Sequence, residues 1–248
     1  GTLTYDQVIS AVARGIPHKV VMPIDFSNGG DAIVADQSIT SVKDFKGKKV
    51  GFSPLSTSDF LLAYALKSHG LSDKDIVPVS MTPENVPSAM ASGSLPIGVT
   101  YEPNVSQVVG LPGNKFHVVY SSKEAPGLIT DVLVFDERVI AKRPAAIKAL
   151  MQGYLDGLSY IETHPDEAAV IIAKVLGVSA EEAKEQLKTV YNIKLPEMAK
   201  NFEKTDATTS FYGSGELIAQ LLKANGQITD IPDFGKTFDT RFVNELTR

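Results

Sequence analysis

The chain has 248 residues, of which 43% are hydrophobic and 21% charged, a composition typical of a folded globular protein with a substantial core. Its 24 basic and 29 acidic residues give a net charge of −5 without a basic patch, which argues against nucleic-acid binding. No apolar run reaches the ~18 residues needed to cross a bilayer.

The sequence contains no cysteine, which excludes thiol nucleophiles, disulfides and cysteine-ligated metals within it. The four histidines, His18, His69, His117 and His164, lack the i, i+3 or i, i+4 spacing of metal ligands. We therefore expect neither a metal site nor a cofactor.

Strand-like and helical segments alternate along the first two thirds of the chain. The expected strands are 19–24, 31–35, 50–52, 75–80, 97–100, 116–120 and 131–135, and the expected helices are 5–14, 60–68, 83–92 and 104–109. The last third is helical, with expected helices at 144–163, 165–176, 179–191, 215–226 and about 240–246. This alternation predicts an α/β architecture with mainly parallel sheets.

Polar loops follow three of the expected strands, where open α/β sheets bind their ligands. DFSNGGD follows KVVMPI, SPLSTSD follows KVGF, and YEPN follows IGVT. In the second loop, Ser56, Thr57 and Ser58 precede a helix whose first backbone N–H groups lack helical partners. Such residues either cap the helix or hold a carboxylate, sulfonate, phosphate or polar ring there.

These segments, in this order, resemble the periplasmic substrate-binding proteins that feed ABC importers of sulfonates, taurine, nitrate and thiamine-pyrimidine precursors. The resembling segments are LTYDQVISAVARGIPHKVV, DFSNGGDAIVA, SVKDFKGKKVGF, GVTYEP, YSSKEAPGLITDVLVF and RPAAIKALMQGYLDGLSYIETHPDEA. The resemblance implies a type II periplasmic-binding-protein fold, in which two α/β lobes close over a ligand. Mapped here, residues 1–36 with 131–248 would form one lobe, residues 37–130 the other, and 32–36 and 132–135 the crossovers.

Proteins of this group usually begin with a strand, a helix and a second strand before the segment that resembles LTYDQV. This chain is therefore expected to lack ~60 residues of the family's fold, the size of ordinary βαβ units. Such a form is expected to be a monomer or a dimer that pairs an edge strand across two chains. The family also implies a periplasmic location, with no signal segment in this sequence.

The resemblance and the loop chemistry together give a set of expected ligand-binding residues: Ser27, Asn28, Gly29, Ser56, Thr57, Ser58, Tyr101, Glu102 and Asp131. The glycine-rich turn lets backbone approach a ligand, and the aromatic ring supplies a flat wall. Glu102 is expected to accept from an amino or amidine group, which disfavours a simple anion such as nitrate. Asp131, at the start of the return crossover, either contacts ligand or ties the lobes together.

The expected function is therefore capture of a small polar or zwitterionic molecule for an ABC permease, without catalysis. Thiamine-pyrimidine precursors come first among the expected ligand classes, and taurine-like sulfonates second. The alternatives are a sensory ligand-binding module and a cofactor-free enzyme on the same fold, with Glu102 or Asp131 as base.

Overall fold

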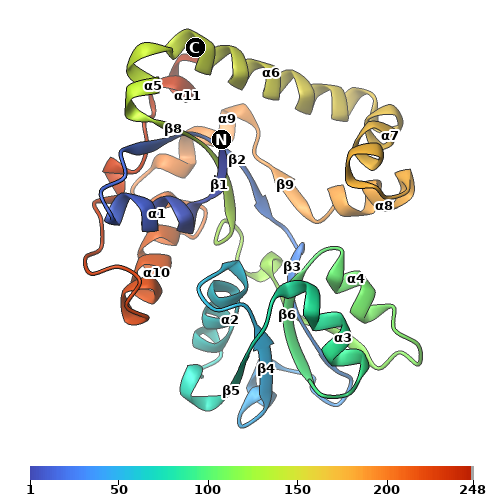
Figure 1. Cartoon of the computed structure of the whole chain (residues 1–248). Helices are drawn as coiled ribbons and strands as arrows, with labels where there is room; N and C mark the ends of the chain where they lie inside the picture. The colour runs from blue at the N-terminus through green and yellow to red at the C-terminus, as the bar shows by residue number, and fades with distance from the viewer. Residues whose placement is uncertain (247–248) are drawn as a thin grey trace. The chain divides into compact units, whose positions relative to one another are not determined.

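The computed structural model describes residues 1–246 and divides into two compact units. Unit 1 contains residues 1–26 and the chain from Thr130 onward, and unit 2 contains Ser27–Ile129. The chain therefore passes between the units at residues 26–27 and 129–130 (Figure 1).

Unit 1 is built on a four-stranded sheet in the order β1-β8-β2-β9, with helices between and after its strands. Its elements are β1 (Thr2–Thr4), α1 (Tyr5–Ala13), β2 (His18–Ser27), β8 (Thr130–Asp136), α5 (Glu137–Lys142), α6 (Pro144–Thr163), α7 (Pro165–Leu176), α8 (Ala180–Leu187), β9 (Val190–Asn192), α9 (Leu195–Met198), α10 (Phe211–Ala224) and α11 (Arg241–Leu246). The long helix α6 packs through Ile147 and Met151, both almost fully buried, in one cluster with Met22 and Leu133 of the sheet.

Unit 2 is built on a five-stranded sheet in the order β5-β4-β6-β3-β7. Its elements are β3 (Asp31–Asp36), β4 (Lys49–Phe52), α2 (Thr57–Ser68), β5 (Val77–Ser80), α3 (Val86–Ala91), β6 (Ile97–Tyr101), α4 (Asn104–Val109) and β7 (Phe116–Ser121). Short 3₁₀ turns precede β4, β5 and α3 and follow β7.

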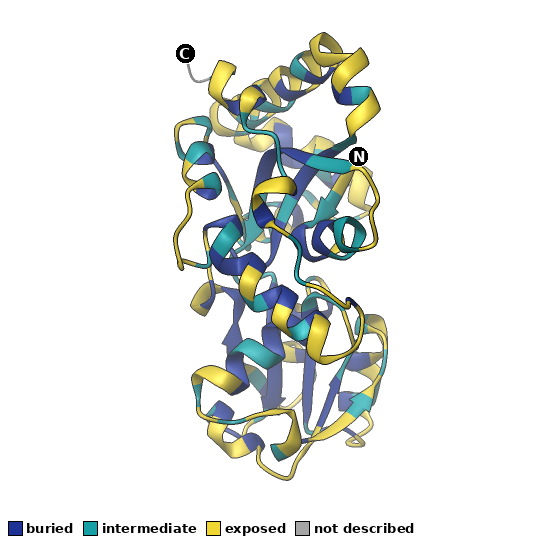
Figure 2. Ribbon diagram, turned by 90° about the vertical axis from the view of Figure 1, so that its left-hand side faces the viewer, coloured by how far each residue is buried: buried dark blue, intermediate teal, exposed yellow. Residues whose placement is uncertain are grey.

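Strand β3 lies inside unit 2 and is covered on both faces. Successive side chains of a strand point to opposite faces. Ile33 accordingly joins the core cluster that contains residues of α2, and Val34 joins the cluster that contains residues of α3 and α4. Figure 2 shows the inner strands of this sheet coloured mostly as buried, with many exposed residues on the helices and loops. A strand buried on both faces reads as a continuous apolar run, as AIVA does here.

The sheets are not mainly parallel, so that prediction is wrong. Strand β4 runs parallel to β5 and β6, but β1–β8, β2–β8, β3–β6 and β3–β7 are antiparallel. The alternation of strands and helices does not predict strand direction here, because β3 and β8 directly follow turns rather than crossover helices. Strand β3 also belongs to the sheet of unit 2. The first boundary between units therefore lies after residue 26, whereas the family resemblance placed it after residue 36.

Several predicted helices differ in extent from the observed ones, among them α8 and α2. Helix α8 ends at Leu187, and Val190–Asn192 forms strand β9 where the sequence pattern extends a helix to residue 191. Helix α2 begins at Thr57, so two of the three predicted loop hydroxyls lie in its first turn. No helix within residues 1–246 is both long and apolar enough to span a membrane.

The packing around Gly98 gives a stability test. A Cβ on Gly98 of β6 would lie 2.4 Å from Val86 Cγ1 and 3.0 Å from Met90 Sδ of α3. Gly98→Ala is therefore expected to destabilise unit 2 by about 2 kcal/mol. Gly153→Ala, in an exposed turn of α6 with nothing within 4 Å of the new Cβ, is expected to stabilise by about 0.5–1 kcal/mol. Urea unfolding of both variants checks the prediction, and equal stability of the two would contradict it.

Candidate functional site

The turn that connects β2 to β3 is held by the hydroxyl groups of Ser27, which is half-buried, and Ser122, which is buried. Ser27 Oγ lies 2.8 Å from Ser122 Oγ, and the backbone N–H of Gly29 donates to Ser122 Oγ at 2.7 Å. The N–H of Asp31 donates to Ser27 Oγ at 3.0 Å. Gly29 has φ +103°, a conformation that L side chains rarely adopt. Two hydroxyls thus hold the predicted turn in one conformation, while the Asn28 side chain makes no hydrogen bond in the described chain.

The end of β6 lies against this same turn. Asp31 pairs with Tyr101 in the β3–β6 register, and the N–H of Glu102 donates to the carbonyl of Gly30 at 2.8 Å. The structure therefore brings together two of the predicted loops within unit 2, Ser27–Gly30 and Tyr101–Glu102.

Tyr101 and Glu102 already have partners in this arrangement. The Tyr101 hydroxyl donates to Glu84 Oε1 at 2.8 Å. Glu102 Oε2 accepts from the N–H of Ser106 at 3.1 Å, and Oε1 accepts from its hydroxyl at 2.9 Å, so this carboxylate caps the start of α4. An amine-bearing ligand would therefore compete with Ser106 for Glu102.

The hydroxyls at the start of α2 serve first as caps. Ser56 Oγ donates to the carbonyl of Ser53 at 2.8 Å and accepts from the N–H of Ser58 at 3.3 Å. The Ser58 hydroxyl is buried and finds no hydrogen-bond partner in the described residues. The backbone N–H groups of Ser56 and Thr57 likewise make no hydrogen bond within the part of the chain that the structure describes. These two N–H groups are the donors that the helix terminus retains for an anion or a polar atom.

An acid also lies in the first turn of α2. Asp59 Oδ2 accepts from the N–H of Leu55 at 2.8 Å, and burial raises the pKa of this carboxyl. Its negative charge interacts favourably with the helix dipole, and it reduces the attraction that this terminus has for a second anion.

In unit 1, the predicted residue Asp131 belongs to a group of three acids with Asp25 and Asp6. Asp25 and Asp131 face each other across the β2–β8 register, and their side chains are hydrogen-bonded to each other. The charge of Asp131 acts on Asp6 of α1 and helps to raise its pKa. Tyr154 of α6 lies near Asp25 and Asp131 and donates to the carbonyl of Ile24 at 3.3 Å. No Lys or Arg of the described residues forms an ion pair with any of the three acids.

Two carboxyl groups can share a hydrogen bond only when one of them carries a proton. Burial, followed by the charge of Asp131, raises the pKa of Asp25 to about 7. Burial also raises the pKa of Asp131 and of Asp6. Asp131 is therefore one half of a proton-sharing pair, and sequence reasoning did not identify this pairing with Asp25.

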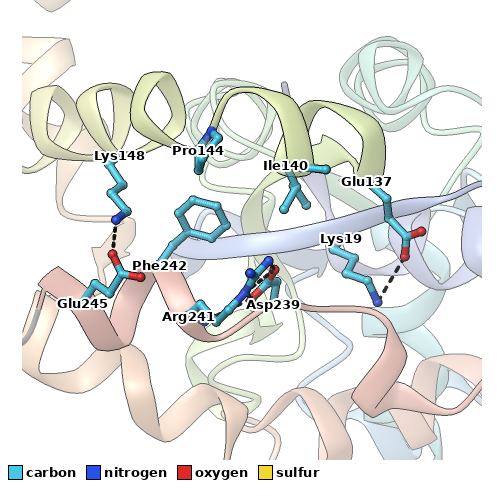
Figure 3. A pocket seen from close by; sticks show the side chains of 10 residues that line it. Lys19, Glu137, Ile140, Pro144, Lys148, Asp239, Arg241, Phe242 and Glu245 are labelled. Carbon is cyan, nitrogen blue, oxygen red and sulfur yellow. Dashed lines mark hydrogen bonds and ion pairs between the residues drawn. The ribbon is translucent and has the colours of Figure 1, made fainter.

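A separate cavity of about 540 Å³ lies in unit 1 and includes none of the predicted site residues (Figure 3). Its apolar wall is formed by Ile140, Pro144 and Phe242, and its charged side chains are paired with one another. Lys19 Nζ lies 3.3 Å from Glu137 Oε1, Arg241 Nη2 lies 2.6 Å from Asp239 Oδ2, and Lys148 pairs with Glu245. Because these charges already neutralise one another, they are not available to bind a charged ligand in this cavity.

The described residues hold no cluster of three or more His, Asp or Glu that could bind a metal. Sequence reasoning also missed Ser122, whose hydroxyl is hydrogen-bonded to Ser27 and Gly29 of the turn. The available signal was the run Ser121-Ser122-Lys123, which directly follows a strand as the three predicted loops do.

A family model described as NMT1/THI5 like matches residues 1–168. Among curated relatives, a Brucella abortus binding protein is 24% identical over 187 residues, covering 73% of this chain and 57% of its own. An Escherichia coli K12 protein named for binding aliphatic sulfonates is 31% identical over 155 residues, covering 60% and 46%. A Haemophilus influenzae protein named for thiamine biosynthesis is 28% identical over 173 residues, covering 65% and 52%. The chain thus spans about half the length of the curated relatives it matches.

Solved structures show the same fold. The periplasmic aliphatic sulphonate binding protein SsuA of Escherichia coli matches with a TM-score of 0.78 at 18% identity, covering 97% of this chain and 75% of its own. The desulfurization enzyme DszB matches with a TM-score of 0.66 at 14% identity, covering 98% and 84%. The α/β periplasmic-binding-protein fold is therefore confirmed, and the same fold also occurs in an enzyme.

The acid pair of unit 1 predicts a pH dependence of stability. Folding raises the pKa of Asp25 from 3.8 to about 7. The protonated carboxyl therefore contributes fully to the free energy of unfolding below about pH 4, and this contribution is lost as the pH rises through about 7. Asp25→Asn keeps a donor to Asp131 without a titrating proton. The variant is therefore expected to be more stable than the wild type at pH 8, on the order of 2 kcal/mol, and to show a flatter profile.

Thermal unfolding at pH 5, 6, 7 and 8 measures this difference. Asp230→Asn, which changes an exposed carboxylate of unit 1, is the control and is expected to follow the wild-type profile. Parallel profiles for the wild type and Asp25→Asn would show that no shared proton stabilises this pair.

Proposed function

Because this chain belongs to the NMT1/THI5-like family, we propose that it is a solute-binding protein that captures a small organic anion. The observation that carries this proposal is the polar turn in unit 2. Hydroxyl groups hold its backbone in one conformation, it lies against the end of β6, and its Asn28 amide has no hydrogen-bond partner among the described residues. Rigid polar groups of this kind fix a ligand's orientation at low entropic cost.

The state of the carboxyl groups supports an anionic ligand over an amine. Both oxygens of Glu102 accept from Ser106, and Asp131 is hydrogen-bonded to Asp25. Glu102, the acid expected to receive an amino group, is thus already engaged, and so is Asp131. The N–H groups of Ser56 and Thr57 at the start of α2 instead suit a sulfonate or carboxylate oxygen. Residues 27–29 and 56–58 remain proposed ligand contacts, together with Tyr101, Glu102 and Asp131.

An aliphatic sulfonate is the proposed ligand class, and this choice reverses the order expected from the sequence. The Escherichia coli relative and the matching SsuA structure are both named for aliphatic sulfonates. A thiamine-pyrimidine precursor is the second candidate, favoured by the name of the Haemophilus influenzae relative. Tyr101 would in that case supply a ring-stacking surface, since more than a third of it is exposed.

We further propose that the protein works outside the cytoplasm and delivers its ligand to an ABC permease. This proposal is supported by the periplasmic location in the name of the SsuA structure and by the importer family that the sequence resembles.

A cofactor-free enzyme is the alternative, because the desulfurization enzyme DszB has the same fold. Glu102 and Asp131 are the candidate bases. Incubation of the protein with each ligand that binds, followed by mass spectrometry of the small molecule, distinguishes the two functions, since a binding protein returns it unchanged.

Isothermal titration with ethanesulfonate, taurine and the aminopyrimidine precursor of thiamine tests the proposal. We expect binding of at least one sulfonate, and we expect Asn28→Ala to weaken it about tenfold because one hydrogen bond to an ionised group is lost. Asn85→Ala removes an exposed amide of unit 2 that caps nothing and is expected to bind like the wild type. Absence of heat with all three compounds would overturn the proposed function.

A further inference from the structure

A lysine side chain lies across the glycine of the polar turn. Lys123 is in the 3₁₀ turn Ser122–Glu124 that follows β7. A Cβ built on Gly29 would lie 2.8 Å from Lys123 Cε and 3.5 Å from both its Cδ and Cγ. The aliphatic stem of Lys123 thus occupies the space that any larger residue at position 29 would fill, and its ammonium group is one bond beyond this contact.

The ammonium group of Lys123 has no ion-pair partner within residues 1–246. Its Nζ also donates no hydrogen bond among the described residues. The adjacent acid, Glu124, is engaged elsewhere, because its Oε2 accepts from the N–H of Ser121 at 3.0 Å and from the Ser121 hydroxyl at 2.7 Å. Glu102, at the end of β6, is likewise bound to Ser106.

Two sets of hydrogen bonds hold the segment that carries Lys123. The Ser121 hydroxyl accepts from the N–H of Lys123 at 3.3 Å within the capping box that Glu124 completes. The adjacent Ser122 is 1% exposed and is hydrogen-bonded to Ser27 and Gly29 of the turn. A lysine stem that packs against fixed backbone loses less freedom when its ammonium group binds a ligand than an unrestrained one does.

We propose that Lys123 is a ligand-binding residue that recognises the negative charge of the solute, with the side-chain amide of Asn28 as a second donor. The inference rests on the proposed solute-binding function and deepens it, because it requires the ligand to carry an anionic group such as a sulfonate. Gly29 is needed at this site for its positive φ and also because it leaves room for the lysine stem. An ammonium group presented beside a glycine turn forms charge-assisted hydrogen bonds to such an oxyanion.

Titration of Lys123→Met with ethanesulfonate tests the proposal, because methionine keeps an unbranched stem over Gly29 and removes the charge. The affinity is expected to fall about tenfold or more. Lys123→Arg retains the charge and is expected to restore most of the affinity. Binding to the wild type is expected to weaken as salt is added, more steeply than binding to Lys123→Met.

Lys115→Met is the matched control, because the stem of Lys115 also packs on a glycine, with Cε 3.5 Å from the Cβ position of Gly113. It is expected to bind ethanesulfonate like the wild type. Unchanged affinity of Lys123→Met would overturn the inference and leave the proposed function standing. A wild-type protein that binds only the pyrimidine would overturn the inference and the proposed anionic ligand class but leave solute binding standing, whereas one that binds none of the compounds would overturn all three.

Discussion

The pairing of β3 with its two neighbours is the constraint on which unit 2 depends. The side chains of Ala32, Ile33, Val34 and Ala35 are fully buried, so the backbone groups between them must be paired within the sheet. That pairing sets the registers Asp31–Tyr101 and Ala32–Ser121. One end of a buried strand thus brings together the glycine turn before it, the end of β6 and the end of β7.

This register explains why the polar groups of the turn come from distant parts of the chain. Ser27 and Ser122 are hydrogen-bonded to each other although 95 residues separate them in sequence. Each hydroxyl also accepts from a backbone N–H of the turn, so the two serines hold a conformation that Gly29 alone leaves free. The turn is therefore rigid because a hydrophobic strand aligns it, and polar because the loops at the strand ends are polar.

The charges of the two units are organised in different ways. In unit 1, Asp25 and Asp131 lie so close that they share a proton, and the charge of Asp131 helps to raise the pKa of Asp6. In unit 2, Glu102 and Glu124 are bound to backbone N–H and hydroxyl donors, and Lys123 has no ion-pair partner within residues 1–246. A residue's charge therefore indicates a ligand's charge only after its own partners in the protein are known. Glu102 illustrates this, because its position suggested an amine and its hydrogen bonds argue against one.

The sequence by itself determined the fold family, the positions of most strands and helices, and three of the loops that follow strands. These features follow from local patterns such as apolar runs, caps and glycine turns, which adjacent residues encode. The tertiary structure alone decided the mixed direction of the sheets, the end of α8 at Leu187, the proton shared by Asp25 and Asp131, and the place of Lys123 over Gly29. Each of these depends on which distant segments become neighbours, and burial and strand register determine that only when the whole chain has folded.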